Sequence, residues 1–150
     1  MLGKSSKVSR SERIAQESIA RQGLKKTVLR SKILGVLLQT TCPLSQAEII
    51  KRLTHQMEVD RISVYRNLGK LLSVGLIHAL EDNSYVACSH ACTEGSHILL
   101  FCQSCQSHLE LGQLDKKNPL LAALTQYYAI DEHRPVYLRG TCKQCEHEAD

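Results

Sequence analysis

The chain has 150 residues, 43% of them hydrophobic and only 4% aromatic, and it carries a net charge of +4. This length allows one domain or two small ones, and small cores gain from a bound metal. The sequence contains no run of 18 apolar residues and no signal peptide, which argues against a membrane-spanning or exported protein, so we expect a cytoplasmic one.

Charge and metal-binding residue types divide the chain into two halves. Residues 1–83 hold 14 Lys and Arg against 7 Asp and Glu, a net charge of +7, whereas residues 84–150 hold 5 against 8, a net charge of −3. Six of the seven cysteines and six of the seven histidines lie from His78 onward. This asymmetry favours a polyanion-binding module followed by a metal-binding module, although ordinary surface charge would explain the charge difference equally well.

The first half is expected to form helices and then a β-hairpin, after a basic, disordered arm at residues 1–10. Apolar periodicity, a capping-box sequence that starts at Ser45 and a capping Asp60 mark the helix positions. The helices are expected at Ser11–Gln22, with Ile14 and Ile19 inward, at Thr27–Thr40, with an apolar stripe that starts at Val28, after Ser45, and from Asp60 to Val74. The hairpin is expected to join Ile77–Leu80 to Tyr85–Ala87. This order is typical of a winged helix-turn-helix.

The helix from Asp60 to Val74 is the candidate for reading DNA. At about 100° per residue its apolar side chains gather on one face. The core face holds Val64, Leu68, Leu71 and Leu72, the opposite face holds Ile62, Arg66, Lys70 and Ser73, and the boundaries hold Ser63 and Tyr65. Arg66 and Lys70 are thus expected to enter a groove, with Ser63 and Tyr65 beside them. The alternative is an amphipathic helix whose polar face is only solvated.

Two cysteine pairs in the second half predict a closed metal site. Cys102-x-x-Cys105 and Cys142-x-x-Cys145 are separated by 36 residues, and each pair can hold one edge of a tetrahedral zinc ion. The alternative is free thiols or two disulfides, and a reducing compartment disfavours the disulfides. Around the pairs we expect an α/β arrangement, with strands at Ile98–Phe101, His108–Leu111 and Val136–Leu138 and a helix at Leu120–Tyr128.

These motifs together resemble the ferric uptake regulator family of metal-dependent bacterial repressors. The matching stretches are Gly23–Thr27 with Arg30, Ser45–Ile50, Ser63–Leu68, Gly75–Ile77 and both cysteine pairs, within roughly residues 14–145. The resemblance implies an α+β fold, in which an N-terminal winged helix-turn-helix precedes a C-terminal α/β dimerisation domain with a four-cysteine zinc site. The expected bounds are an arm at 1–10, a DNA-binding domain at 11–87, a hinge at 88–96 and a dimerisation and metal-binding domain at 97–150.

The sensor metal is expected to differ from that of the family's iron-responsive members. Those members usually show a His-His-Asp-His run before the first cysteine pair, and this chain lacks it. Instead, a set of four residues is similar to the sensory site of the family's zinc uptake branch: His78, Cys88, His97 and Glu110. Thiolate with imidazole favours zinc over ferrous iron. Taken singly, Cys88 is also compatible with a buried apolar role and His78 with a surface role on a strand.

Several other residues leave alternatives open. His90 competes with His97 as a ligand and forms, with His133, a possible further metal site. Cys92 and Cys42 have no assigned role. We expect surface positions for three remaining histidines: His55, His108 and His147.

The resemblance implies a zinc-responsive repressor of zinc-uptake genes, with structural and regulatory Zn²⁺, that acts as a homodimer on a near-palindromic double-stranded DNA operator. The alternative within the family is an iron- or peroxide-responsive regulator. An enzyme is not expected, because a zinc deaminase needs His-x-Glu before Pro-Cys-x-x-Cys, whereas here His97 is followed by Ile98-Leu99 and no Pro precedes either cysteine pair.

Overall fold

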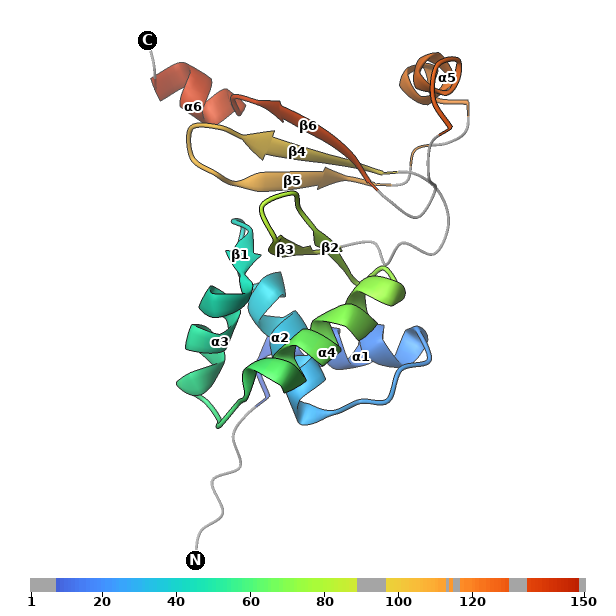
Figure 1. Cartoon of the computed structure of the whole chain (residues 1–150). Coiled ribbons are helices and arrows are strands. Elements are labelled where there is room, and N and C mark those ends of the chain that lie inside the picture. The colour runs from blue at the N-terminus through green and yellow to red at the C-terminus, as the bar shows by residue number, and fades with distance from the viewer. Residues whose placement is uncertain (1–7, 89–96, 113, 115–116, 130–134, 149–150) are drawn as a thin grey trace, which may run out of the picture.

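A computed structural model describes residues 8–88, 97–112, 114, 117–129 and 135–148 of the chain. A group of helices at one end carries a small sheet, and a second sheet lies above it (Figure 1). The elements in chain order are α1 (Arg10–Arg21), α2 (Val28–Leu38), β1 (Leu44–Ser45), α3 (Gln46–Thr54), α4 (Arg61–Ser73), β2 (Ile77–Ala79), β3 (Ser84–Ala87), β4 (Ile98–Cys102), β5 (His108–Leu111), α5 (Pro119–Thr125), β6 (Val136–Gly140) and α6 (Lys143–Glu148).

Polar caps set the starts of the first four helices. The side chains of Ser9, Thr27, Ser45 and Asp60 each accept a hydrogen bond from a backbone N–H in the first turn of α1, α2, α3 and α4, respectively. At Ser45 the capping box is complete, since the side chain of Glu48 also accepts from the Ser45 N–H. The capping positions expected at Ser45 and Asp60 are therefore confirmed.

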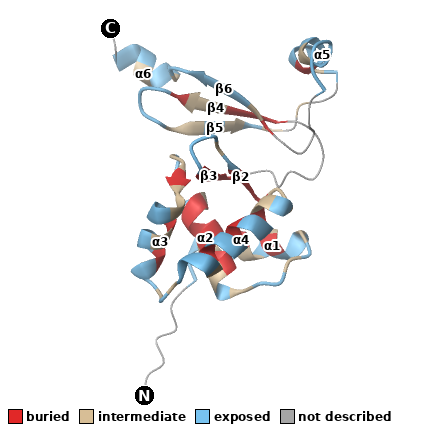
Figure 2. Ribbon diagram, in the orientation of Figure 1, coloured by how far each residue is buried: buried red, intermediate tan, exposed pale blue. Residues whose placement is uncertain are grey.

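The core of the helical part surrounds α2, which lies between α1, α3 and α4 (Figure 2). This central position corrects two expectations. The apolar stripe of α2 does not start at Val28, which is 65% exposed, because burial extends around the helix from Arg30 to Leu37. On α1, Ala15 is buried, while Ile14 is 44% exposed. The buried face of α1 therefore runs through Ala15 and Ile19.

The small sheet is the wing, with strand order β1-β3-β2 and antiparallel pairing throughout. The hairpin of β2 and β3 was expected from the sequence, whereas β1 was not. β1 has only two residues, Leu44 and Ser45, which is too short for a period of two to appear in the sequence.

The second sheet has the order β5-β4-β6, with β4 antiparallel to β5 and parallel to β6. Its register places Glu110 and Tyr137 on either side of Leu99, and His108 and Arg139 on either side of Phe101. Side chains alternate between the faces of a strand, so these two rows share one face, and contacts of Glu110 and Tyr137 show that it faces the wing. The opposite face carries Leu100, Leu109, Leu111 and Leu138.

The expected α+β class is confirmed, with a winged helix-turn-helix followed by an α/β part. The short helix α6, which contains Cys145, was not expected. Among the described residues, no helix is long and apolar enough to cross a membrane.

Candidate metal centres and nucleic-acid interface

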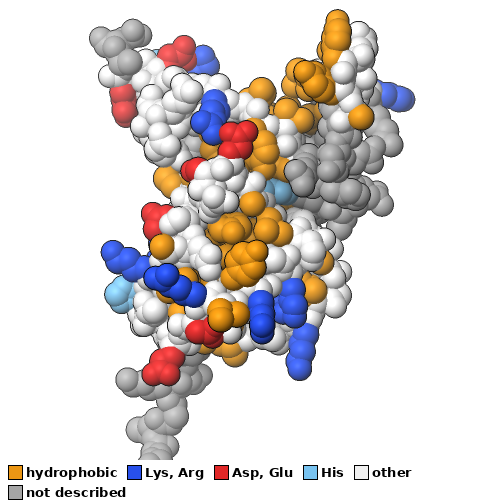
Figure 3. Space-filling model, in the orientation of Figure 1, with side chains coloured by type: hydrophobic (Ala, Val, Ile, Leu, Met, Phe, Trp, Pro, Cys, Tyr) orange, Lys and Arg blue, Asp and Glu red, His pale blue; other side chains and the backbone are white. Residues whose placement is uncertain are grey.

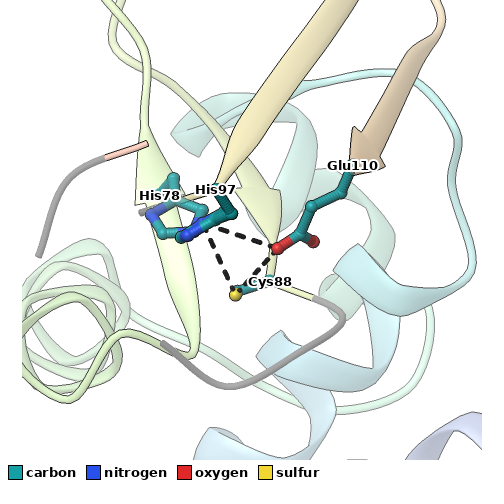
Figure 4. Close-up of polar contacts among 4 residues, drawn as sticks. All are labelled: His78, Cys88, His97 and Glu110. Atoms are coloured by element: carbon teal, nitrogen blue, oxygen red, sulfur yellow. Dashed lines mark hydrogen bonds and ion pairs between the residues drawn. The ribbon is translucent and has the colours of Figure 1, made fainter. Parts of the chain in front are cut away.

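Four potential ligands meet between the wing and the second sheet (Figure 4). His97 Nε2 lies 2.8 Å from His78 Nε2, 3.4 Å from Glu110 Oε1 and 3.9 Å from Cys88 Sγ, and Cys88 Sγ lies 3.2 Å from Glu110 Oε1. All four ligand atoms lie within 4.8 Å of one another. We name this set the interface cluster.

The interface cluster suits a four-coordinate metal ion. A tetrahedron with bonds of 2.0–2.3 Å has edges of about 3.3–3.8 Å, close to the observed separations. Its side chains are nearly inaccessible: His78, Cys88 and His97 are 2–6% exposed, and the side chain of Glu110 is 5% exposed. Ionisable side chains are seldom buried together without a partner, and a shared cation would stabilise them. One thiolate, two imidazoles and one carboxylate form a donor set that suits zinc.

The two parts of the fold contribute equally to the interface cluster. His78 lies at the centre of β2 and Cys88 directly follows β3, while His97 directly precedes β4 and Glu110 lies in β5. Backbone bonds fix the two residues outside the strands. The Cys88 N–H donates to the Leu76 carbonyl at 2.9 Å, and the His97 carbonyl accepts from the Val136 N–H at 2.9 Å. The cluster therefore joins two parts that are each held by their own backbone hydrogen bonds.

The four paired cysteines form a second cluster at the far end of the sheet, which we name the four-cysteine cluster. Their sulfur atoms lie within 4.8 Å of one another, with Cys105 Sγ 3.9 Å from Cys142 Sγ. Cys102 ends β4, Cys105 lies in the turn before β5, Cys142 follows β6 and Cys145 lies in α6. None of the four is in a disulfide. The expected approach of both pairs to one centre is thus present.

Backbone amides prepare this cluster for a cation. N–H groups of Cys105 and Cys142 stabilise the Cys102 thiolate and lower its pKa to about 6; the Cys142 N–H lies 3.3 Å from Cys102 Sγ. The hydroxyl and the N–H of Ser107 lower the pKa of Cys105. A hydrogen bond between the Cys145 and Cys142 side chains is the main cause that raises the pKa of Cys145 to about 12, and burial and the repulsion from the Cys102 thiolate act in the same direction. A dication would remove that repulsion.

The remaining candidate ligands divide into three groups. His90, Cys92 and His133 lie outside the described residues, so the possible further site stays a prediction. His55 and His147 are exposed, as expected. His108 was expected at the surface, but its Nδ1 is buried without a hydrogen-bond partner, and burial lowers its pKa. The reason is its position in β5, on the face that lies against the wing.

The exposed face of α4 agrees with the expected reading face. Val64, Leu68 and Leu71 are buried, whereas Tyr65, Arg66 and Lys70 are exposed and Ser63 is partly so. Lys and Arg side chains lie over the helical part of the molecule in the space-filling view (Figure 3). The helix thus presents the cationic side chains of Arg66 and Lys70 and the ring of Tyr65 to solvent. These are groups that contact phosphates and base edges.

Arg30 is a positioning residue that the sequence pattern did not reveal. Only 5% exposed, it donates through Nε to Asn67 Oδ1 of α4 at 3.1 Å and through Nη1 to the Lys25 carbonyl. Asn67 in turn donates to the Ser63 carbonyl at 2.8 Å. These bonds attach the inner side of α4 to the start of α2. Helical periodicity assigned only apolar residues to the interior, so it gave no signal for a buried guanidinium.

The model of one protein family, described as the ferric uptake regulator family, matches residues 21–134. The chain belongs to this family. Within it, the chain is 28% identical over 125 residues to the zinc uptake regulation protein of Mycobacterium tuberculosis, an alignment that covers 82% of this chain and 95% of that protein. The family resemblance inferred from the motifs is therefore confirmed.

Solved structures of family members agree with the observed arrangement. The structure described as holo XcZur aligns with a TM-score of 0.71 at 26% identity, covering 91% of this chain and 96% of that one. A zinc uptake regulator complexed with zinc and DNA aligns with a TM-score of 0.72, covering 95% and 99% of the two chains. At 21% identity, this second likeness concerns the fold alone.

Proposed function

We propose that this family member is a zinc-responsive repressor that binds operator DNA as a homodimer and controls zinc-uptake genes in the cytoplasm. The interface cluster is the observation that carries the proposal. It combines one sulfur, two nitrogen and one oxygen donor, and it lies where a bound ion would join the wing to the second sheet. The similarity to zinc uptake regulation proteins supports the same reading.

The proposed roles of the segments follow the domain bounds expected from the sequence. Residues 11–87 form the DNA-binding domain behind a basic arm at 1–10, residues 88–96 form the hinge, and residues 97–150 form the dimerisation and metal-binding domain. The four-cysteine cluster would hold structural zinc, and the interface cluster would hold regulatory zinc. Two sensor ligands, His78 and Cys88, then precede the hinge, and His97 and Glu110 follow it.

The residues of the interface cluster supply the mechanism through their placement. A bound zinc ion would act as a cross-link that favours one angle between the two domains. His78 and Cys88 belong to the wing. The wing follows α4 in the chain, and the Cys88 N–H donates to the carbonyl of Leu76, which lies between α4 and β2. Holding the wing therefore holds the reading face in position, and DNA must in turn tighten zinc binding by the same factor.

Arg66→Ala is expected to lower operator affinity by about 1–3 kcal/mol, roughly 5- to 150-fold, because it removes a bidentate donor from the exposed face of α4. Operator titrations at one fixed salt concentration measure the change, and base preference at one operator position should relax. Arg52→Ala, at an exposed position in α3, is the matched charge control. Unchanged affinity and base preference in Arg66→Ala would remove α4 from the reading role.

Leu109→Glu is expected to convert the dimer to monomer and to abolish tight operator binding. Leu109, Leu111 and Leu138 are 59%, 42% and 44% exposed on one sheet face, which is the surface we assign to the second subunit. A charge in such an interface leaves an unpaired ion on association. Sedimentation gives the oligomeric state, and Glu58→Gln is a surface control in the helical part. A dimeric Leu109→Glu chain would move the interface elsewhere.

Metal content and metal-dependent DNA binding test the proposal directly. The purified chain is expected to contain two zinc ions, of which a mild chelator removes one, and operator binding should be lost with that ion. Zinc should restore binding, whereas ferrous iron should not. Restoration by iron, or loss of binding caused by peroxide in the presence of zinc, would favour an iron- or peroxide-responsive regulator.

A further inference from the structure

A second connection between the wing and the second sheet lies beside the interface cluster. Tyr137 Oη donates to the carbonyl of Ala79 at 3.2 Å, from β6 to β2. Ala79 directly follows His78, and Tyr137 shares a row of the sheet with Glu110, with Leu99 between them. The adjacent wing residues His78 and Ala79 therefore lie against Glu110 and Tyr137, respectively, which flank Leu99 in one row of the sheet.

We propose that Tyr137 is a positioning residue that latches the wing onto the sheet and thereby presets His78 for the regulatory metal. The effect on zinc binding rests on the proposed function, whereas the contact between Tyr137 and Ala79 does not. The outer strands of a three-stranded sheet are about 10 Å apart. The interface cluster and the hydrogen bond between the His108 N–H and the Thr41 carbonyl both hold the wing at the β5 side of the sheet. An attachment at β6, about 10 Å across the sheet, resists rotation of the wing about that side.

The surroundings of the Tyr137 hydroxyl show why this one hydrogen bond contributes to holding the wing on the sheet. Beside the latch, an open cavity of about 330 Å³ lies between the two parts, and its lining includes Leu80, Phe101 and Tyr137, so continuous apolar packing does not hold the two parts together at this point. Asp82 of the wing turn lies across from Arg139. Its pKa is lowered mainly by hydrogen bonds from Ser84, and Arg139 acts in the same direction.

One backbone amide reports whether the interface is closed. The His108 N–H donates to the Thr41 carbonyl at 2.8 Å, a bond that joins β5 to the segment before β1. Any opening of the wing away from the sheet breaks this bond and exposes the amide to exchange. Its exchange rate therefore measures interface opening without a label and without reference to metal.

Removing the Tyr137 hydroxyl should raise the equilibrium constant for opening of the wing away from the sheet by about 2- to 10-fold, which corresponds to the net contribution of one hydrogen bond. If the competent arrangement is less populated, the apparent zinc affinity falls by up to that factor. Intrinsic ligand chemistry is unchanged, because Tyr137 is not a ligand. Folding should also be preserved, since Tyr137 is 40% exposed and the substitution deletes only one oxygen.

The test compares Tyr137→Phe with Tyr127→Phe in the full dimer that retains its four-cysteine metal. Tyr127 is 80% exposed after α5 and serves as the matched control. In Tyr137→Phe, with the metal of the interface cluster removed, we expect the His108 amide to exchange about 2- to 10-fold faster. We also expect a similar rise in the zinc concentration needed for half-maximal operator binding. Tyr127→Phe should match the wild-type chain in both measurements.

The outcomes separate the two proposals. Unchanged amide exchange in Tyr137→Phe overturns the latch, whatever zinc does. Faster exchange with an unchanged zinc requirement overturns the presetting of His78. A wild-type chain whose operator binding ignores zinc contradicts the proposed function, while the amide exchange still decides whether the latch exists.

Discussion

Cys102→Ser is expected to remove the metal of the four-cysteine cluster and to unfold the second sheet. Cys102 ends the central strand β4 and is the most buried of the four cysteines, so its loss breaks the site where it is joined to the sheet. Metal binding at such sites is coupled to folding and is worth about 10–16 kcal/mol in small zinc domains, which is as large as the whole free energy of unfolding of a typical domain. Zinc analysis, circular dichroism and sedimentation together measure the effect.

The matched control for this substitution is Cys42→Ser. Cys42 is also a free cysteine, but it lies in the loop before β1 and belongs to neither cluster. That variant should retain its zinc, its dimer and its thermal stability. A Cys102→Ser chain that remains folded, dimeric and fully loaded with zinc would show that the four cysteines do not hold structural metal.

Cys88→Ser is expected to abolish zinc-dependent operator binding and leave the fold intact. The substitution keeps the size of the side chain but replaces a readily deprotonated soft ligand with a hydroxyl. Cys88 Sγ lies 3.2 Å from Glu110 Oε1 and 3.9 Å from His97 Nε2, so the loss falls at the centre of the interface cluster. The chain should bind one zinc ion fewer, remain dimeric and bind its operator weakly even with zinc added.

The control for Cys88→Ser is Cys88→Ala, which distinguishes ligand loss from packing. If Cys88 is only a buried apolar residue, alanine should be tolerated nearly as well as cysteine, and zinc-dependent binding at wild-type affinity should persist. If Cys88 is a ligand, both variants should fail alike. In the first case the sensor would have to be sought near His90, Cys92 and His133.

The sequence allowed prediction of features whose signals are local. Capping at Ser45 and Asp60, the outward face of α4 and the approach of the cysteine pairs all follow from patterns within a few residues or from spacing. The members of the interface cluster came from the family resemblance, because no spacing rule joins His78 to Glu110 across 32 residues. Their convergence requires the wing to lie on the sheet, which only the structure shows.

Features that depend on long-range packing were not predictable in this way. Arg30 is buried where Asn67 of α4 accepts a hydrogen bond from its Nε, and Val28, the first residue of α2, is exposed. His108 is partly buried, with an inaccessible Nδ1, because its side chain lies on the sheet face that is turned to the wing. For Arg30 and His108 the covering element is remote in sequence and leaves no trace in local periodicity.

The strand β4 begins next to His97 and ends at Cys102, so one element spans both clusters, about 17 Å apart along the chain. On the proposed roles of the two clusters, this connection would couple their metals. Loss of the four-cysteine metal would release the end of β4 and with it the position of His97 beside His78. If the chain is the zinc-responsive repressor proposed above, newly made chains in a cell that recovers from zinc starvation would bind the structural metal first and respond to zinc only afterwards, so incomplete molecules would not repress zinc uptake.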